Sequence, residues 1–502
     1  MGFFQKLSIF RPIRPLLTTW GNSGRYALQF MSINAIIYTA AALAFLYFCD
    51  TSLCQNAPAD SVLTPPGNIA KMNSESERAA VLTAARARRQ KWPPFEPVAL
   101  FHAEELGIRR LNGRHVDFYT DLPSTPETDS VVEALDRAVP LLCHYFSIPE
   151  AAYESWRIEA FLMNEREPFE IFGALTGAPE FANGYSLYNR IWVFDKKQGY
   201  YNRFLLLHEL VHTFMDEVFG SLEPRWYSEG IAEYLALHRW DGQTLTLGIF
   251  PENAEEIAGF GRIDRIRSEA QKQNIAEPKT VFQFDYRDYE DVGTYAWSWG
   301  MVTLLARDGR YADFLALMPY LMTRPDPTAE FLRLSGAGAT LATDWRDFVT
   351  TIDYGYDFGA TRLDYTPGKP LGQEPATLEL SVTGGGWQNS HIALDKSQSV
   401  EISASGRFRV GDQRRKLPCE ANGITIRYVG GRPMGTLLAT IIADPADGTL
   451  PITPIGTGAR LTAEKAGTLY FRLNLPPGEI TRGEGTVRIE IAPRTKAAAD
   501  AP

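Results

Sequence analysis

The chain of 502 residues is poor in cysteine and lacks several common functional motifs. Its four cysteines include no CxxC pair, which fits neither a disulfide scaffold nor a cysteine metal site. No Gly-rich loop follows a strand-like run, and no fixed-period repeat is visible. The formal net charge is -10, whereas a nucleic-acid binder shows a basic patch or stripe. We therefore expect no nucleic-acid partner.

Acidic residues are also missing from the chain before Asp50, and this end is strongly apolar. Between Arg25 and Asp50 there is no charge, and the core INAIIYTAAALAFLYF is long enough to cross a bilayer as a helix. Because basic residues precede this run, that end is expected in the cytoplasm. Cleavage near Ala57-Pro58-Ala59 is the alternative, but that pattern lies far from the apolar run. We expect an uncleaved, single-pass anchor in a bacterial inner membrane, with the bulk of the chain periplasmic or extracellular.

The remainder of the chain changes character twice. Strand-like runs alternate with helical ones as far as the stretch HELVH, which indicates a mixed α/β region. From Glu229 to about Phe358 the pattern is helical. YTPGKPLGQEPAT, Tyr365 to Thr377, then interrupts it with Pro and Gly. Short alternating runs such as VEISASGRFRV and GTVRIEIA follow, and they predict an all-β sandwich.

These patterns predict an α+β fold followed by an all-β sandwich, with one N-terminal transmembrane helix. The expected parts are a basic cytoplasmic segment 1–25, an anchor 26–49, a spacer 50–95, a metal-binding α+β domain 96–362, a linker 363–378, a β-sandwich 379–494 and a disordered tail 495–502.

HELVH, from His208 to His212, places two histidines four residues apart. On a helix they lie one turn apart on the same face, where two imidazoles can bind one Zn²⁺. Glu209, beside the first histidine, then points toward a water on the metal. The flanking residues are apolar, and buried polar groups need partners. The alternative is the ordinary face of a buried helix without metal.

A catalytic zinc site needs a third protein ligand. WYSEGIAEY, Trp226 to Tyr234, places Glu229 in the first turn of a second predicted helix. Glu233 shares its face, and we expect it to hydrogen-bond a ligating histidine and fix the tautomer of that ring. Asp216, one turn after His212, is a rival for either role.

HExxH followed by W-x-x-E-G-x-A-E-Y resembles the gluzincins, the zinc peptidases similar to thermolysin and the aminopeptidases. The resemblance covers roughly residues 110 to 355. It implies an α/β upper lobe, a helical lower lobe, and Glu229 as the third zinc ligand beside His208 and His212. The gap between His212 and Glu229 is slightly shorter than in thermolysin or the aminopeptidases, which favours a compact bacterial branch of the clan.

Two further features of this family have partial counterparts. Gluzincin aminopeptidases stabilise the oxyanion with a tyrosine in a Y-x-x-G stretch, and Tyr295-Ala-Trp-Ser298 resembles it with serine in place of glycine. The alternative for Tyr295 is an aromatic residue packed at a helix start. PEFANGYSLYNRIWVF, Pro179 to Phe194, occupies the place of the family's substrate-binding edge strand. The aminopeptidase signature G-x-M-x-N is missing there, which favours an endopeptidase.

The C-terminal region, about Gly385 to Ile491, resembles the bacterial galactophilic lectins. Those lectins bind sugar through calcium held by an N-D pair and a later D-N pair. Here Leu475 follows Asn474, and ITRGEG stands in place of the later pair. Calcium prefers carboxylates, so we expect a supporting role, or docking to an envelope glycan or protein, rather than a calcium-sugar site.

Two functions from different classes follow. The first is a membrane-anchored zinc metallopeptidase that hydrolyses peptide bonds of a peptide or protein substrate outside the cytoplasm. Its nucleophile is a zinc-activated water, Glu209 is the general base and Tyr295 the oxyanion donor. The second is a catalytically inactive envelope-binding protein that acts through its β domain.

Overall fold

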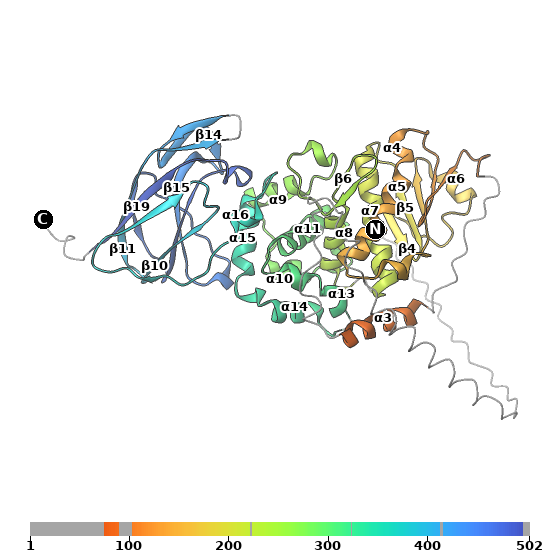
Figure 1. Cartoon of the computed structure of the whole chain (residues 1–502), viewed down its shortest axis with the longest axis horizontal. Coiled ribbons are helices and arrows are strands. Elements are labelled where there is room, and N and C mark those ends of the chain that lie inside the picture. The colour runs from red at the N-terminus through yellow and green to blue at the C-terminus, as the bar shows by residue number, and fades with distance from the viewer. Residues whose placement is uncertain (1–74, 90–102, 221–222, 323, 412–414, 495–502) are drawn as a thin grey trace, which may run out of the picture. The chain divides into compact units, whose positions relative to one another are not determined.

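The computed structural model describes residues 75–89, 103–220, 223–322, 324–411 and 415–494 (Figure 1). The expected cytoplasmic segment, the anchor 26–49, much of the spacer and the tail lie outside these residues. None of the described helices has the length and apolar character that a membrane span requires. The chain divides into a unit Met1–Asp60 and a unit Ser61–Pro502, and everything below concerns the second.

A five-stranded mixed sheet opens the described part of this unit, in the order β1-β2-β3-β5-β4. Its strands are β1 (Arg109–Asn112), β2 (Val116–Thr120), β3 (Ile158–Met163), β4 (Gly184–Leu187) and β5 (Arg190–Phe194). The three central strands are parallel, and β1 and β4 run antiparallel at the two edges. Every residue of β2 and β3 is buried, as expected when both faces of a sheet are covered.

Alternate residues of the central strands belong to two different hydrophobic cores, because successive side chains point to opposite faces of the sheet. Phe118 and Ala160 belong to the large core shared with the long helices. Their neighbours Tyr119 and Phe161 stack on each other at 5.1 Å between ring centroids, in a smaller core on the other face. The sheet is thereby fixed between two layers.

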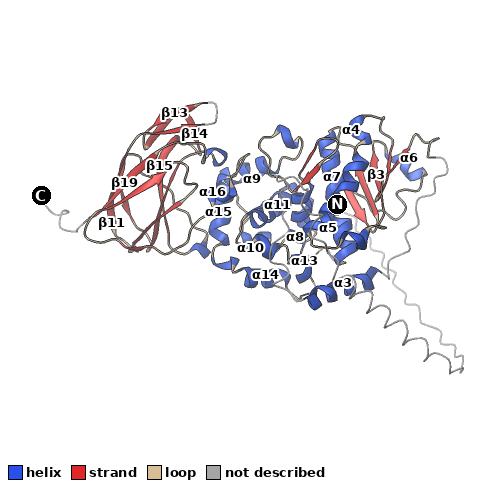
Figure 2. Cartoon of the chain, in the orientation of Figure 1, coloured by secondary structure: helices blue, strands red, loops and turns tan. Residues whose placement is uncertain are grey.

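The long helices pack on one another beside the sheet (Figure 2). They are α5 (Val131–Tyr145), α7 (Gly199–Phe219), α8 (Arg225–Ala236), α9 (Arg262–Gln271), α11 (Val292–Arg307) and α15 (Leu341–Thr351). A further long helix, α3 (Glu75–Arg89), packs on α7. The shorter elements are α4 (Pro126–Asp129), α6 (Arg166–Ile171), α10 (Pro278–Val281), α12 (Ala312–Leu315), α13 (Met318–Leu321), α14 (Pro327–Ser335), α16 (Phe358–Thr361) and the hairpin β6 (His238–Trp240) with β7 (Leu245–Leu247).

Helix α7 is central to this arrangement. It is buried on all sides from Asn202 to Met215, which is the pattern of a helix inside a core rather than on a surface. It ends at Gly220, whose left-handed φ of 67° lets its N–H bond back to the carbonyl of Asp216. Its polar residues therefore sit among apolar neighbours on every side.

The helical pattern expected from Glu229 onward is interrupted soon after its start. Helix α8 ends at Ala236, and His238 lies in strand β6. The ring of His238 stacks on Tyr200 at 4.6 Å, and its Nε2 accepts a hydrogen bond of 2.8 Å from Arg203. These tertiary contacts with α7 hold the residue in an extended strand.

Residues 369–494 form a β-sandwich. Its strands are β8 (Lys369–Pro370), β9 (Ala376–Ser381), β10 (Gln388–Leu394), β11 (Ser399–Ser405), β12 (Phe408–Gly411), β13 (Lys416–Cys419), β14 (Asn422–Val429), β15 (Arg432–Ile442), β16 (Thr453–Pro454), β17 (Gly458–Thr462), β18 (Gly467–Leu473) and β19 (Thr486–Pro493). One sheet has the order β14-β15-β18-β10-β8 with β16 beside β15, and the other has the order β17-β11-β19-β9. In β19 the residues Val487, Ile489 and Ile491 are fully buried and alternate with exposed ones, which confirms the predicted β-rich C-terminal region.

The sandwich is fastened to helix α15 by polar contacts. Asp347 of α15 accepts hydrogen bonds from Trp387 Nε1 at 3.0 Å and from Arg472 Nη1 at 3.1 Å. The Arg472 guanidinium lies 4.4 Å from the centroid of the Trp387 ring. Tyr365, within the stretch expected as a linker, donates to Asp344 of the same helix at 2.9 Å. Tyr365 thus attaches the start of this stretch to α15.

Candidate metal centre

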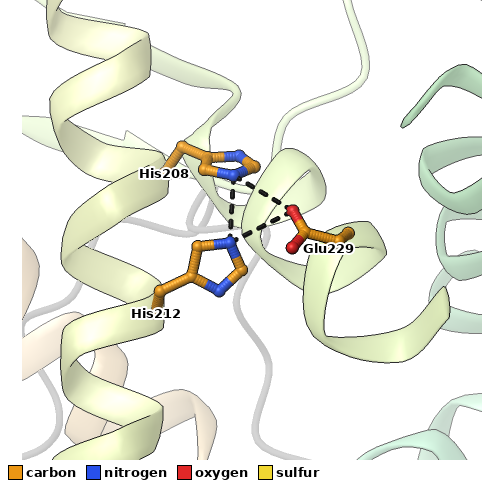
Figure 3. Close-up of side chains that lie close together, drawn as sticks. All are labelled: His208, His212 and Glu229. Atoms are coloured by element: carbon orange, nitrogen blue, oxygen red, sulfur yellow. Dashed lines mark hydrogen bonds and ion pairs between the residues drawn. The ribbon is translucent and has the colours of Figure 1, made fainter. Parts of the chain in front are cut away.

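The two histidines of HELVH and the glutamate of the E-G pair come together at the contact between α7 and α8 (Figure 3). His208 and His212 project from the same side of α7, one turn apart. Glu229 projects toward them from the first turn of α8. Sequence spacing predicts the histidine pair, and the packing of the two helices brings in the carboxylate.

The three ligand atoms are spaced as a metal ion requires. His208 Nε2 and His212 Nε2 lie 3.0 Å apart, and Glu229 Oε2 lies 3.4 and 3.2 Å from them. In a tetrahedral zinc site, bonds of about 2.0–2.1 Å place neighbouring ligand atoms roughly 3.3–3.4 Å apart. The observed separations therefore fit one small divalent cation bound by all three residues.

The three groups are also buried together. The side chains of His208, His212 and Glu229 are only 7, 8 and 12% exposed. The Nδ1 atoms of both rings are buried and make no hydrogen bond within the described residues. A bound cation would coordinate the converging Nε2 atoms, which here contact one another and Glu229.

The charges of the three groups are strongly coupled. Burial lowers the pKa of His208, but its hydrogen bond to Glu229 and the nearby carboxylates outweigh this and raise the pKa to about 9. Burial likewise raises the pKa of Glu229, yet the two histidines hold it well below its usual range. The surroundings of His208 thus stabilise positive charge, which a metal ion can supply in place of a proton.

Glu209 lies on α7 between the two histidines and faces the edge strand β4. A Cβ atom at Gly184 would lie 2.8 Å from Glu209 Oε1, so a larger residue there would force this carboxylate to shift. Burial raises the pKa of Glu209, and a hydrogen bond from Ser186 partly opposes the shift. The sequence motif predicts the importance of Glu209 but gives no sign of Gly184 and Ser186, which are 25 and 23 residues earlier in the chain.

Tyr295 lies in the first turn of α11, beside the metal group. Its ring centroid is 6.3 Å from that of His208, and burial raises the pKa of its hydroxyl. Tyr289 packs edge-on against it at 4.9 Å and shares a hydrogen bond of 2.6 Å with Ser298. Ser298 therefore bonds to a second tyrosine, which the sequence did not indicate.

Glu233 lies one helical turn beyond Glu229, and its Oε1 is 3.6 Å from Nδ1 of His208. That separation is longer than a hydrogen bond, so the expected bond to the histidine is not formed in this structure. Both carboxylate oxygens instead accept hydrogen bonds of 3.0 Å from Arg262. Arg262 is 29 residues away in sequence and carries no motif that would have indicated it.

The rival third ligand and the C-terminal candidate residue lie elsewhere. Asp216 is not part of the group of metal-ligating side chains found among the described residues. The Asn474 side chain donates to the backbone carbonyls of Val429, Arg432 and Pro433, at 3.0, 3.1 and 3.1 Å. Its amide thus closes the turn between β14 and β15.

Comparisons with known proteins add little to this geometry. No family model matches the chain. No curated protein matches it either. One solved structure, described as "EclA N-terminal domain; PllA-like lectin", aligns with 24% of this chain, in its C-terminal region, and with 95% of its own length. The two are 15% identical and the TM-score is 0.19, so the match carries no functional argument.

Proposed function

We propose that this chain is a zinc-dependent metallopeptidase of gluzincin type. The observation that carries this proposal is the convergence of two imidazole nitrogens and one carboxylate oxygen within 3.0–3.4 Å, with Glu209 beside them. Three protein ligands with one open position is the arrangement of catalytic rather than structural zinc sites. The resemblance of HELVH and WYSEGIAEY to the gluzincin motifs supports the same assignment.

The residues around the site fit peptide hydrolysis. Zinc held by His208, His212 and Glu229 would supply a Lewis acid for the scissile carbonyl and an activated water as nucleophile. Glu209 would take a proton at its carboxylate and return it to the leaving amine. The Tyr295 hydroxyl would donate to the carbonyl oxygen as negative charge develops on it.

An extended substrate fits the strand beside Glu209. β4 is the last strand in the order of its sheet and pairs with β5 on its inner side. An exposed strand edge binds extended peptides through backbone hydrogen bonds, which do not depend on sequence. We propose an endopeptidase, held in a bacterial inner membrane by residues 26–49 and acting outside the cytoplasm, with the β-sandwich as a support or envelope-binding part.

The test is metal analysis together with cleavage of a mixed peptide set by the full-length protein. We expect about one zinc per chain, and cleavage that stops with a chelator and returns when zinc is added. Cleavage that persists without metal would contradict the proposal. A folded chain that binds no zinc and cleaves no peptide would favour the envelope-binding alternative.

A further inference from the structure

A buried ion pair between Arg262 and Glu233 lies next to the proposed metal ligands, on the Nδ1 side of His208. Arg262 donates from Nε and Nη2 to the two oxygens of Glu233, each at 3.0 Å. The side chains are 10 and 2% exposed. Glu233 Oε1 in turn lies 3.6 Å from the unpaired Nδ1 of His208. These contacts run from Arg262 through Glu233 to the Nδ1 side of the His208 ring.

The same guanidinium also contacts the second functional group of the site. Arg262 is the first residue of α9, which packs on α11. Its Cζ lies 5.8 Å from the centroid of the Tyr295 ring and 5.3 Å from that of Phe260, whose carbonyl accepts a bond from Nη1 at 3.2 Å. One side chain is therefore held between the carboxylate behind His208 and the ring of the proposed oxyanion donor.

We propose that Arg262 is a positioning residue of the metal centre. By bonding to both oxygens of Glu233 it fixes the plane of that carboxylate, with Oε1 facing Nδ1 of His208. A carboxylate oxygen 3.6 Å from Nδ1 favours the tautomer with hydrogen on that nitrogen, which leaves the lone pair of Nε2 available to the metal. Its face at the same time supports the Tyr295 ring.

The choice of arginine agrees with this role. A guanidinium presents parallel donors that match a carboxylate, whereas a lysine is a single point charge. Fold stability alone gives a weak reason to retain the pair, because buried ion pairs are often no better than packed apolar residues of similar volume. A requirement for fixed geometry at the metal explains its presence.

This inference rests on the proposed zinc site but not on peptide hydrolysis, so it is tested by zinc affinity. The variant is Arg262→Lys, measured by competition with a chromophoric chelator, with Co²⁺ absorption as a second readout of ligand geometry. The matched control is Arg472→Lys, the same exchange in the buried pair with Asp347 far along the chain. Thermal unfolding of the metal-free proteins shows whether each variant folds.

We expect Arg262→Lys to bind zinc about 10- to 100-fold more weakly and to show an altered Co²⁺ spectrum, while Arg472→Lys binds zinc like the parent. Equal zinc affinity of Arg262→Lys and the parent would overturn the inference, as would equal losses in both variants. A parent that binds no zinc would overturn the proposed function itself.

Glu233→Gln provides a second route if Arg262→Lys does not fold. The amide retains an acceptor for Arg262 but presents a donor as well, so we expect zinc affinity to fall in the same range. In the double variant with Arg262→Lys the loss should not exceed that of the larger single change, because both act through one contact. Additive losses, or unchanged affinity in Glu233→Gln, would overturn the inference.

Discussion

The two halves of the described chain differ in what they bury. In the α+β region the buried residues include ionisable groups on facing helices, among them His208, Glu209, Glu233 and Arg262. In the β-sandwich the buried polar side chains are Thr436, Thr440 and Asn474, none of them charged. Its core is otherwise apolar and alternates with exposed residues.

This difference separates a region that buries ionisable groups from one whose buried polar residues are uncharged. Burying charge costs free energy unless the groups are paired or bind a metal. A core that contains several such groups therefore indicates a function for them. In the α+β region that function is the proposed zinc site. The sandwich buries no comparable set within its described strands, and its polar residues close turns and join it to α15.

The strongest test of the comparison removes a ligand from the α+β region. Glu229→Ala leaves two protein ligands where a catalytic zinc uses three, so we expect loss of the metal and of all peptide cleavage. Zinc content by mass spectrometry of the native protein measures this. The matched control is Glu479→Ala in the sandwich, where a carboxylate pairs with Arg427 at 2.7 Å. Retention of zinc by Glu229→Ala would show that another residue is the third ligand.

Glu209→Gln distinguishes the base from the ligands. The amide is nearly the same size but accepts no proton, and general-base catalysis is typically worth about 10² to 10⁴ in rate. We expect kcat to fall by that range while zinc stays bound. Glu217→Gln, on the same helix and paired with Arg89, is the control and should leave kcat unchanged. Full peptidase activity in Glu209→Gln would refute the proposed mechanism.

Tyr295→Phe removes one hydroxyl and keeps the ring against His208. If that hydroxyl donates to the oxyanion, kcat should fall about 10²-fold with little change in KM. Tyr289→Phe, which loses the bond to Ser298, is the comparison variant. A larger loss of kcat in Tyr289→Phe than in Tyr295→Phe would exchange the roles of the two tyrosines.

The contact between the two regions is tested at Asp347. Asp347→Ala leaves Arg472, whose side chain is 15% exposed, without its carboxylate, and breaking a buried pair costs about 3–5 kcal/mol. We expect a lower denaturant midpoint for unfolding and unchanged zinc affinity. Asp347→Asn, which keeps an acceptor for Trp387, should lose less. An unaltered midpoint in Asp347→Ala would show that the contact contributes nothing to stability.

The smallest effect is expected from calcium. A site occupied at a hundredfold excess over its Kd would stabilise the fold by about 2.7 kcal/mol, but Asn474 is committed to three carbonyls. We therefore expect no change in the unfolding temperature of the zinc-loaded protein between calcium and a calcium chelator. A calcium-specific increase would restore a metal role to the sandwich.

Several elements could be predicted from the sequence because their signals are local. The strand-like runs before HELVH correspond to strands of the mixed sheet, among them β2 and β5. The alternation near the C-terminus predicts the sandwich, and the four-residue spacing of HELVH places both histidines on one face of α7. The strand β6 was missed, because its conformation is set by contacts of His238 with Tyr200 and Arg203 rather than by its own residues.

The sequence by itself determined which residue types could form a metal site and that His208 and His212 share a helix face, since helix periodicity is a property of the chain alone. Only the tertiary structure decided which groups surround them. The lack of a side chain at Gly184 accommodates Glu209, and hydrogen bonds from Arg262 fix Glu233 beside the His208 ring. These contacts join segments far apart in the chain, and they depend on how helices and strands pack, which no local pattern encodes.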